Sequence, residues 1–188
     1  MSAAIEVRFT RAEDLSAVCR IVNHYIETTA INFRGAPQTP EEWLRDFREL
    51  RTRYPWLVAE AGGEVLGMAY AGPWKTRAAY DWCAEVTVYV ADETRGRGVG
   101  RALYRRLFEL LDQQGYRTAV AIIALPNAAS VALHEAFGFS HAGTLRGIGY
   151  KLGEWRDVGF WQRDSRPAGD APQTIRAVPG LPPEVEVT

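Results

Sequence analysis

Segments with the alternation of β-strands and segments with the spacing of α-helices follow one another in a definite order, which constrains the fold more than any other feature. We expect the order β-α-α-β-β-β-α-β-α-β-β along the first 164 residues. This order is typical of an α/β (α+β) protein with a mixed sheet and helices on both faces. No internal repeat or interdomain linker interrupts it, so residues 1–164 are expected to form one domain.

Two capping-box sequences mark the starts of the first helices. Thr10-Arg-Ala-Glu13 is expected to open a helix that continues to Ile26, and Thr39-Pro-Glu-Glu42 a helix that continues to Leu50. Further helices are expected at 98–114 and 130–137. The expected strands are 5–9, 56–61, 64–71, 83–90, 118–125, 139–144 and 157–163, with Gly62-Gly63 as a hairpin turn and 119–125 buried on both faces.

Composition excludes several classes of protein. The chain is 47% hydrophobic and 24% charged with a net charge of −1, values typical of a globular domain without a nucleic-acid partner. The 2 cysteines, Cys19 and Cys83, are too far apart to suggest a disulfide framework or a zinc site, and we expect no metal. Without an apolar leader or membrane-length segment, a cytoplasmic protein with no membrane partner is expected.

The last segment, residues 165–188, differs from the rest of the chain. It is rich in proline and has neither helical nor strand periodicity. We therefore expect an extended or disordered tail.

The segment that carries most of the chemistry is a strand followed by a glycine-rich turn. In Glu85–Val90, the polar side chains at 85, 87 and 89 share one face and the valines share the other. The turn Arg95-Gly-Arg-Gly-Val-Gly100 leads into a helix, whose free N–H groups would form an anion cradle. The glycine spacing fits neither a nucleoside-triphosphate P-loop nor a dinucleotide fingerprint. An arginine-flanked turn exposed to solvent is the alternative.

These residues resemble a known superfamily. Arg95-x-x-Gly98-x-Gly100 after a strand is similar to the acyl-CoA pyrophosphate signature of the GNAT N-acetyltransferases. Asn127-x-x-Ser130…His134-x-x-x-Gly138-Phe139 resembles their Asn…Gly-Phe segment. The closer resemblance is to the phosphinothricin N-acetyltransferase family, and it extends from about Arg8 to Asp164. It is carried by Ile21-Val-Asn-His-Tyr-Ile-Glu-Thr28, Arg53–Glu60, Ala69–Lys75, Ala79-Tyr-Asp-Trp82, Thr87–Val90 and Asp157–Gln162.

The resemblance implies a fold and an activity. The fold would be a central, mostly antiparallel sheet that splays between its fourth and fifth strands. The activity would be direct transfer of an acetyl group from acetyl-CoA to the α-amine of a small acceptor such as phosphinothricin or methionine sulfoximine. Members of the family are homodimers, so a homodimer is also implied.

The resemblance also implies roles for particular residues. Glu85 would be the general base, Tyr89 would lie at the thioester, and His134, where most of the superfamily has tyrosine, would handle a proton. Residues implied for acetyl-CoA are Val88, Tyr89, Val90, Arg95, Gly96, Arg97, Gly98, Val99, Gly100, Asn127 and Ser130. Residues implied for the acceptor are Phe33, Lys75, Arg77, Tyr80 and Thr87.

Plainer interpretations of the same residues stay open. Glu85 would then be a half-buried carboxylate paired with a cation, His134 a bonded helical histidine, and Lys75 and Arg77 parts of a solvated loop. Two other functions are also consistent with the sequence. One is a GNAT enzyme acting on a different amine or a protein N-terminus, and the other is a non-catalytic acyl-CoA-binding module.

Overall fold

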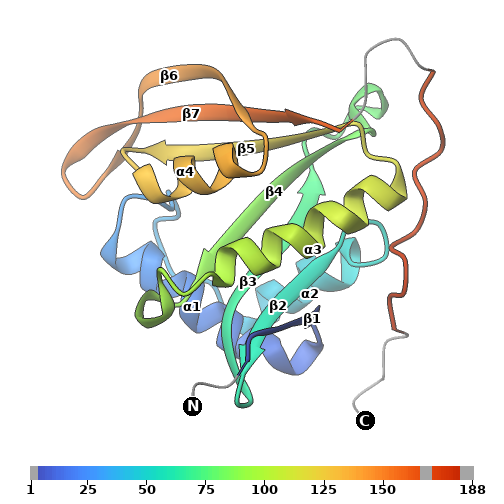
Figure 1. The fold of residues 1–188 in the computed structure, drawn as a ribbon. Coiled ribbons are helices and arrows are strands. Elements are labelled where there is room, and N and C mark those ends of the chain that lie inside the picture. The colour runs from blue at the N-terminus through green and yellow to red at the C-terminus, as the bar shows by residue number, and fades with distance from the viewer. Residues whose placement is uncertain (1–3, 166–170, 183–188) are drawn as a thin grey trace.

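The computed structural model describes residues 4–165 and 171–182 and contains one seven-stranded sheet (Figure 1). The strand order is β1-β2-β3-β4-β5-β7-β6. Strands β4 and β5 pair in parallel, and every other neighbouring pair is antiparallel. The predicted mixed, mostly antiparallel sheet is confirmed.

The strands are β1 (Glu6–Phe9), β2 (Trp56–Ala61), β3 (Glu64–Pro73), β4 (Cys83–Val90), β5 (Thr118–Leu125), β6 (Ser140–Lys151) and β7 (Glu154–Asp164). The helices are α1 (Leu15–Thr28), α2 (Pro40–Leu50), α3 (Val99–Gln114) and α4 (Ala128–Ala136). Strands β6 and β7 are several residues longer than the sequence predicts. They meet at a two-residue turn, where Leu152 and Gly153 both have positive φ.

The two capping-box predictions have opposite outcomes. At α2, the Thr39 hydroxyl accepts from the Glu42 N–H at 3.2 Å and the Glu42 carboxylate accepts from the Thr39 N–H at 2.8 Å, as predicted. The box expected from Thr10 to Glu13 is wrong. There the Asp14 carboxylate accepts from the Arg11 N–H at 2.7 Å, and α1 begins only at Leu15 after a short 3₁₀ turn.

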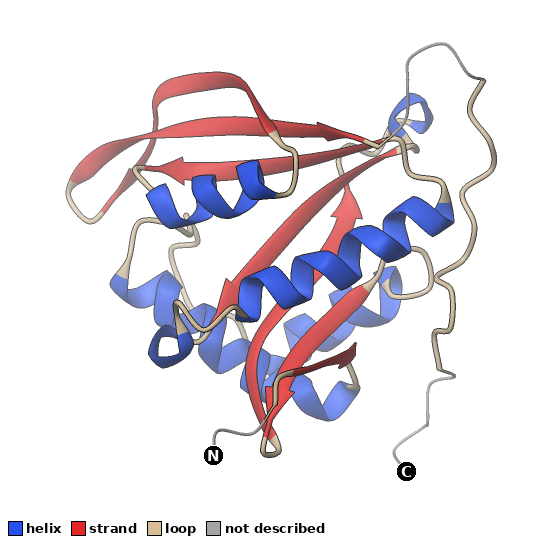
Figure 2. Cartoon of the chain, viewed as in Figure 1, coloured by secondary structure: helices blue, strands red, loops and turns tan. Residues whose placement is uncertain are grey.

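Helices cover both faces of the sheet, as predicted (Figure 2). Helix α3 buries Leu103, Tyr104 and Leu107 completely against one face. Helices α1 and α2 pack on the other face, where Trp43, Phe47 and Trp56 form an edge-to-face aromatic group.

In the described residues, no helix is both long enough and apolar enough to cross a membrane.

The sheet opens between β4 and β5. These strands pair only over Cys83–Glu85 and Thr118–Val120, and beyond that point β5, β7 and β6 diverge from β4 (Figure 1). Residue 122 lies beyond the paired region, and the Ile122 side chain is 43% exposed although the run 119–125 predicts burial on both faces. The opening therefore exposes one edge of β4 along half of its length.

The described part of the tail, residues 171–182, is extended and lies against the domain (Figure 1). The Arg176 N–H donates to the Gln114 carbonyl, and the Gln114 amide donates to the Arg176 carbonyl at 2.8 Å. Val178 is 6% exposed. This part of the tail therefore covers the end of α3.

Candidate active site

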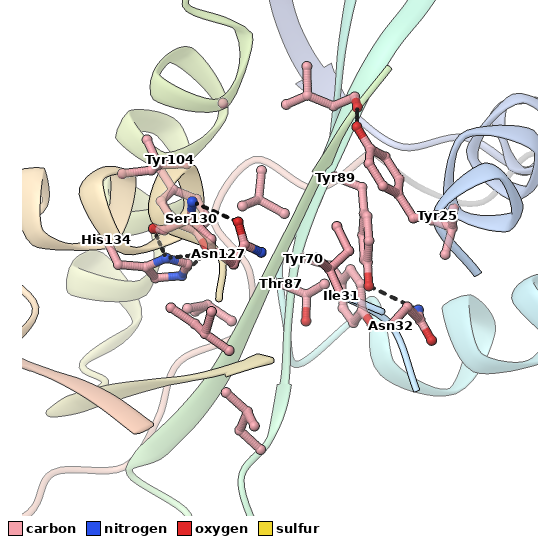
Figure 3. Close-up of a pocket in the computed structure, with 18 of the residues that line it drawn as sticks. Tyr25, Ile31, Asn32, Tyr70, Thr87, Tyr89, Tyr104, Asn127, Ser130 and His134 are labelled. Atoms are coloured by element: carbon pink, nitrogen blue, oxygen red, sulfur yellow. Dashed lines mark hydrogen bonds between the residues drawn. The ribbon is translucent and has the colours of Figure 1, made fainter. Parts of the chain in front are cut away.

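A cavity of about 970 Å³ occupies the opening between β4 and β5. Figure 3 shows that β4 passes between two groups of side chains in this cavity. Tyr89, Thr87 and Asn32 lie on one side of the strand, and His134, Ser130 and Asn127 lie on the other. The cavity thus joins two compartments that could hold two different molecules.

The open edge of β4 presents unpaired main-chain groups to the cavity. The Ala91 N–H donates to the Leu66 carbonyl of β3 at 2.8 Å. Because successive N–H groups of a strand point in opposite directions, the Tyr89 amide also faces β3, whereas the amides of Val88 and Val90 face the opening. The free donors are therefore those on either side of Tyr89, the residue that the sequence analysis placed at the thioester.

Glu85 lies at the closed end of the opening, at the last residue pair of β4 with β5. Its side chain lines the cavity and is half-buried. Burial raises the pKa of the Glu85 carboxyl above its ordinary value, and the positive charge of Lys75 offsets part of this rise. A carboxylate with a raised pKa is a better proton acceptor, as a general base requires.

The compartment on the α1 side contains hydrogen-bonded aromatic residues. The Tyr25 hydroxyl donates to the Val90 carbonyl at 2.6 Å, and the Asn32 amide donates to the Tyr89 hydroxyl at 2.9 Å. Burial raises the pKa of Tyr89 to about 12, so its hydroxyl keeps its proton at neutral pH. The loop between α1 and α2 thus contributes directly to this compartment through Ile31, Asn32, Phe33 and Arg34.

The glycine-rich turn lies at the other end of the cavity. Gly96 and Gly98 have φ of 75° and 83°, values that favour glycine, and Gly98 is the residue before α3. The first N–H groups of α3 therefore face the cavity without helical partners. The Arg95 guanidinium lies 5.5 Å from the centre of the Tyr25 ring and pairs with Asp92 at 3.1 Å. Such a turn provides both N–H donors and a cation for an anion.

His134 is fully engaged by neighbouring groups. Its Nδ1 lies 2.7 Å from the Ser130 carbonyl, which can only accept, so Nδ1 carries the proton. Its Nε2 then accepts from the Tyr104 hydroxyl at 2.7 Å. The residue is 3% exposed, and burial lowers the pKa of the imidazole. The protein therefore holds a neutral His134 in one tautomer.

The structure brings most of the predicted site residues together. Those that line the cavity are Phe33, Glu85, Thr87, Val88, Tyr89, Val90, Arg95, Gly96, Gly98, Val99, Gly100, Asn127, Ser130 and His134. Four others, Arg97, Lys75, Arg77 and Tyr80, lie outside the lining. Lys75 stacks on the Trp74 ring at 4.5 Å, and Tyr80 is 40% exposed at the end of a 3₁₀ turn.

The residues of the site that sequence reasoning missed include Tyr25, Asn32 and Tyr104. Each contacts a predicted site residue through a bond that links positions far apart in the chain. Tyr25 and Tyr104 look like ordinary core positions of amphipathic helices in the sequence. No local signal distinguishes them from other buried aromatic residues.

Comparison with known families identifies the family to which this chain belongs. The acetyltransferase (GNAT) domain family matches residues 7–159. The chain therefore belongs to the GNAT acetyltransferases.

Within that superfamily, its similarities are more specific. A phosphinothricin N-acetyltransferase of Streptomyces viridochromogenes is 57% identical over 160 residues, which cover 85% of this chain and 87% of that protein. An L-methionine sulfoximine/L-methionine sulfone acetyltransferase of Pseudomonas paraeruginosa is 37% identical over 176 residues, which cover 92% of this chain and 100% of that protein. The chain is accordingly an N-acetyltransferase of the phosphinothricin N-acetyltransferase family, as its motifs predict.

A solved structure agrees with this assignment. The phosphinothricin acetyltransferase of Sinorhizobium meliloti, crystallised in complex with acetyl-CoA, superposes with a TM-score of 0.81. It is 32% identical, and the match covers 85% of this chain and 88% of that one. The predicted GNAT fold is confirmed.

The geometry of His134 predicts its titration. At pH 7, ¹⁵N NMR should show a neutral ring with its proton on Nδ1. Because the folded pKa is lowered, the unfolded chain binds this proton first, and the free energy of unfolding should decrease as the pH falls below about 6.5. Tyr104→Phe, which removes the donor to Nε2, should raise the pKa of His134. A ring protonated on Nε2 at pH 7 would contradict the assignment.

Proposed function

We propose that the cavity binds acetyl-CoA on the α3–α4 side of β4 and a small amino-acid-like acceptor on the α1–α2 side, and that the acetyl group moves directly to the acceptor's α-amine. The observation that carries this proposal is the position of Glu85. Its half-buried carboxylate stands where β4 and β5 separate and the two compartments meet. Phosphinothricin and methionine sulfoximine are the acceptors that the relatives' names suggest.

The cofactor side suits the chemistry of acetyl-CoA. The turn from Arg95 to Gly100 would bind the pyrophosphate through the N-terminus of α3 and the Arg95 guanidinium. The amides of Val88 and Val90 would hold the pantetheine and the thioester oxygen in place of the missing strand. Asn127, which caps α4 by accepting from the Ser130 N–H at 3.2 Å, would add a contact with the pantetheine. Among the described residues, no group of three or more His, Cys, Asp or Glu side chains is arranged so that it could hold a metal ion.

Proton transfer would begin at Glu85. An α-amine is protonated near neutral pH, so it must lose a proton, directly or through water, before it can attack the thioester carbon. The attack forms a C–N bond, and collapse of the intermediate breaks the C–S bond. The departing thiolate then needs a proton. The nitrogen of the intermediate carries one, and His134 offers a second route if its bond to Ser130 is exchanged for one to sulfur.

The acceptor side combines aromatic walls with hydroxyl groups. Phe33, Thr87 and Tyr89 line it directly. Lys75, Arg77 and Tyr80 lie outside the cavity lining, but the Lys75 charge acts on Glu85. We assign these three residues to attracting an anionic acceptor toward the cavity, with Arg77 suited to a carboxylate or phosphinate.

Because such an enzyme uses acetyl-CoA, we place it in the cytoplasm.

A homodimer is also part of this proposal. Large apolar side chains of the β6–β7 hairpin are 46–68% exposed, far more than the core residues. They are Leu145, Ile148, Tyr150, Leu152 and Trp155. Tyr150 and Trp155 contact each other with ring centres 5.2 Å apart, and a second copy of the chain would cover these side chains.

The activity is tested by thiol release. Wild-type protein mixed with acetyl-CoA should release CoA with phosphinothricin or methionine sulfoximine, more slowly with common amino acids, and not with a peptide that begins with Ser or Ala. Glu85→Gln keeps the shape of the side chain but removes the base, so kcat should fall about 100-fold at neutral pH. The decline of the rate at low pH should follow the raised pKa of Glu85 and disappear in the variant. An unchanged kcat would exclude Glu85 as the base.

The cofactor assignment predicts a selective effect of Arg95→Ala. Losing the cation at the turn should raise KM for acetyl-CoA about tenfold and leave KM for the amine within about twofold. Arg45→Ala, which removes an exposed arginine of α2 paired with Asp46, serves as the control. A larger effect on the amine than on acetyl-CoA would place the cofactor elsewhere.

The dimer is tested by sedimentation equilibrium, which should give twice the chain mass. Trp155→Glu introduces a charge on a side chain that is 68% exposed, so it should produce a folded monomer. Glu154→Gln, at the neighbouring position, should remain dimeric. A wild-type monomer at micromolar concentration would contradict the proposal.

A further inference from the structure

The end of the β6–β7 hairpin has two different faces. Side chains alternate along a strand, so Tyr150 points away from the domain and is 63% exposed, and Leu152 in the following turn is 58% exposed. Gly149 and Lys151 occupy the opposite face. That face lies against the α1–α2 loop, which lines the acceptor compartment.

Lys151 joins this loop to α1. Its ammonium donates to the Asn32 carbonyl in the loop and to the Ile26 carbonyl in the last turn of α1, both at 2.5 Å. The Ile26 carbonyl is among the last four of α1, which have no helical partner and attract a cation. The Lys151 ammonium thus provides the hydrogen-bond donor for one carbonyl of the helix and one carbonyl of the loop.

The contact continues from the loop to β4. While the Asn32 carbonyl accepts from Lys151, its side-chain amide donates to the Tyr89 hydroxyl and its side-chain oxygen accepts from the Arg34 N–H at 2.9 Å. Figure 3 shows Asn32 pointing toward Tyr89 across the cavity. Lys151 therefore acts on the cavity through Asn32 and touches neither Tyr89 nor the cavity itself.

Two details fit a positioning function. A Cβ atom on Gly149 would lie 2.1 Å from the Phe33 ring, so glycine is needed for Phe33 to pack against the hairpin. Lys75 and Lys151 are also the only lysines in a chain whose other permanent cations are arginines. Two carbonyls converging on one nitrogen suit a compact ammonium better than a planar guanidinium.

We propose that Lys151 is a positioning residue for acceptor recognition. It holds the α1–α2 loop so that Asn32 and Phe33 present a fixed wall to the acceptor, while the cofactor side stays independent of it. This inference rests on the proposed function, because it assigns the α1–α2 side to the amine.

The test is steady-state kinetics of Lys151→Met with phosphinothricin or methionine sulfoximine as acceptor. Methionine keeps the length of the side chain but cannot donate to either carbonyl. We expect KM for the amine to rise about tenfold, and KM for acetyl-CoA to stay within about twofold. Lys151→Arg should recover part of the loss. Glu154→Gln, across the same turn, should leave both constants unchanged.

A second measurement separates positioning from general destabilisation. If Lys151 acts through Asn32 on Tyr89, the amine KM of Lys151→Met/Tyr89→Phe should be lower than the product of the two single effects. Acetyl-CoA binding by calorimetry and the sedimentation mass should match the wild type. Multiplicative effects, or an equal rise in both KM values, would overturn the proposal.

Failure of the proposed function and failure of the positioning function of Lys151 give different results. A wild-type protein that releases no thiol with any amine would reject the proposed function. An active wild type with an unchanged amine KM in Lys151→Met would reject only the positioning function of Lys151.

Discussion

The functional part of this structure depends on the failure of β4 and β5 to stay paired beyond Glu85 and Val120. A buried strand edge without a neighbour leaves N–H and C=O groups that must be satisfied by something else. At this edge the Tyr25 hydroxyl donates to the Val90 carbonyl. The amides of Val88 and Val90, which face the same opening, stay available for a ligand. The opening in the sheet thus creates both the space for a cofactor and the donors that would bind it.

The sequence predicts the framework well where patterns are local. Strands 83–90 and 118–125 agree with the structure to the residue, because each is an uninterrupted apolar or alternating run. The sequence predicts the length of a strand poorly where a glycine inside that strand is needed for close packing. Gly147 and Gly149 conceal the length of β6, since they look like breakers in the sequence, yet Gly149 provides the space for Phe33. The capping box predicted from Thr10 to Glu13 is wrong because Asp14, one residue after Glu13, caps the same turn by accepting from the Arg11 N–H.

The candidate site also contains residues that local patterns predict and residues that they do not. Alternation along β4 and the glycine turn place Glu85, Thr87 and Arg95 correctly around one cavity. Asn32 and Tyr104 could not be found, because what places them at the site is a hydrogen bond to a residue 57 or 30 positions away. The state of His134 is of this kind as well. Its neutral tautomer depends on the Ser130 carbonyl and on a tyrosine from another helix.

The tail segment 171–182 changes where the folded unit ends. Gln114 has no exposure to solvent, and its amide divides its two hydrogen bonds between the Arg53 and Arg176 carbonyls. A truncation after β7 would remove the Arg176 carbonyl, one of the two acceptors of this amide, and the hydrogen bond from the Arg176 N–H to the Gln114 carbonyl. Trimming or fusing the protein at residue 165 would therefore cut into its packed body.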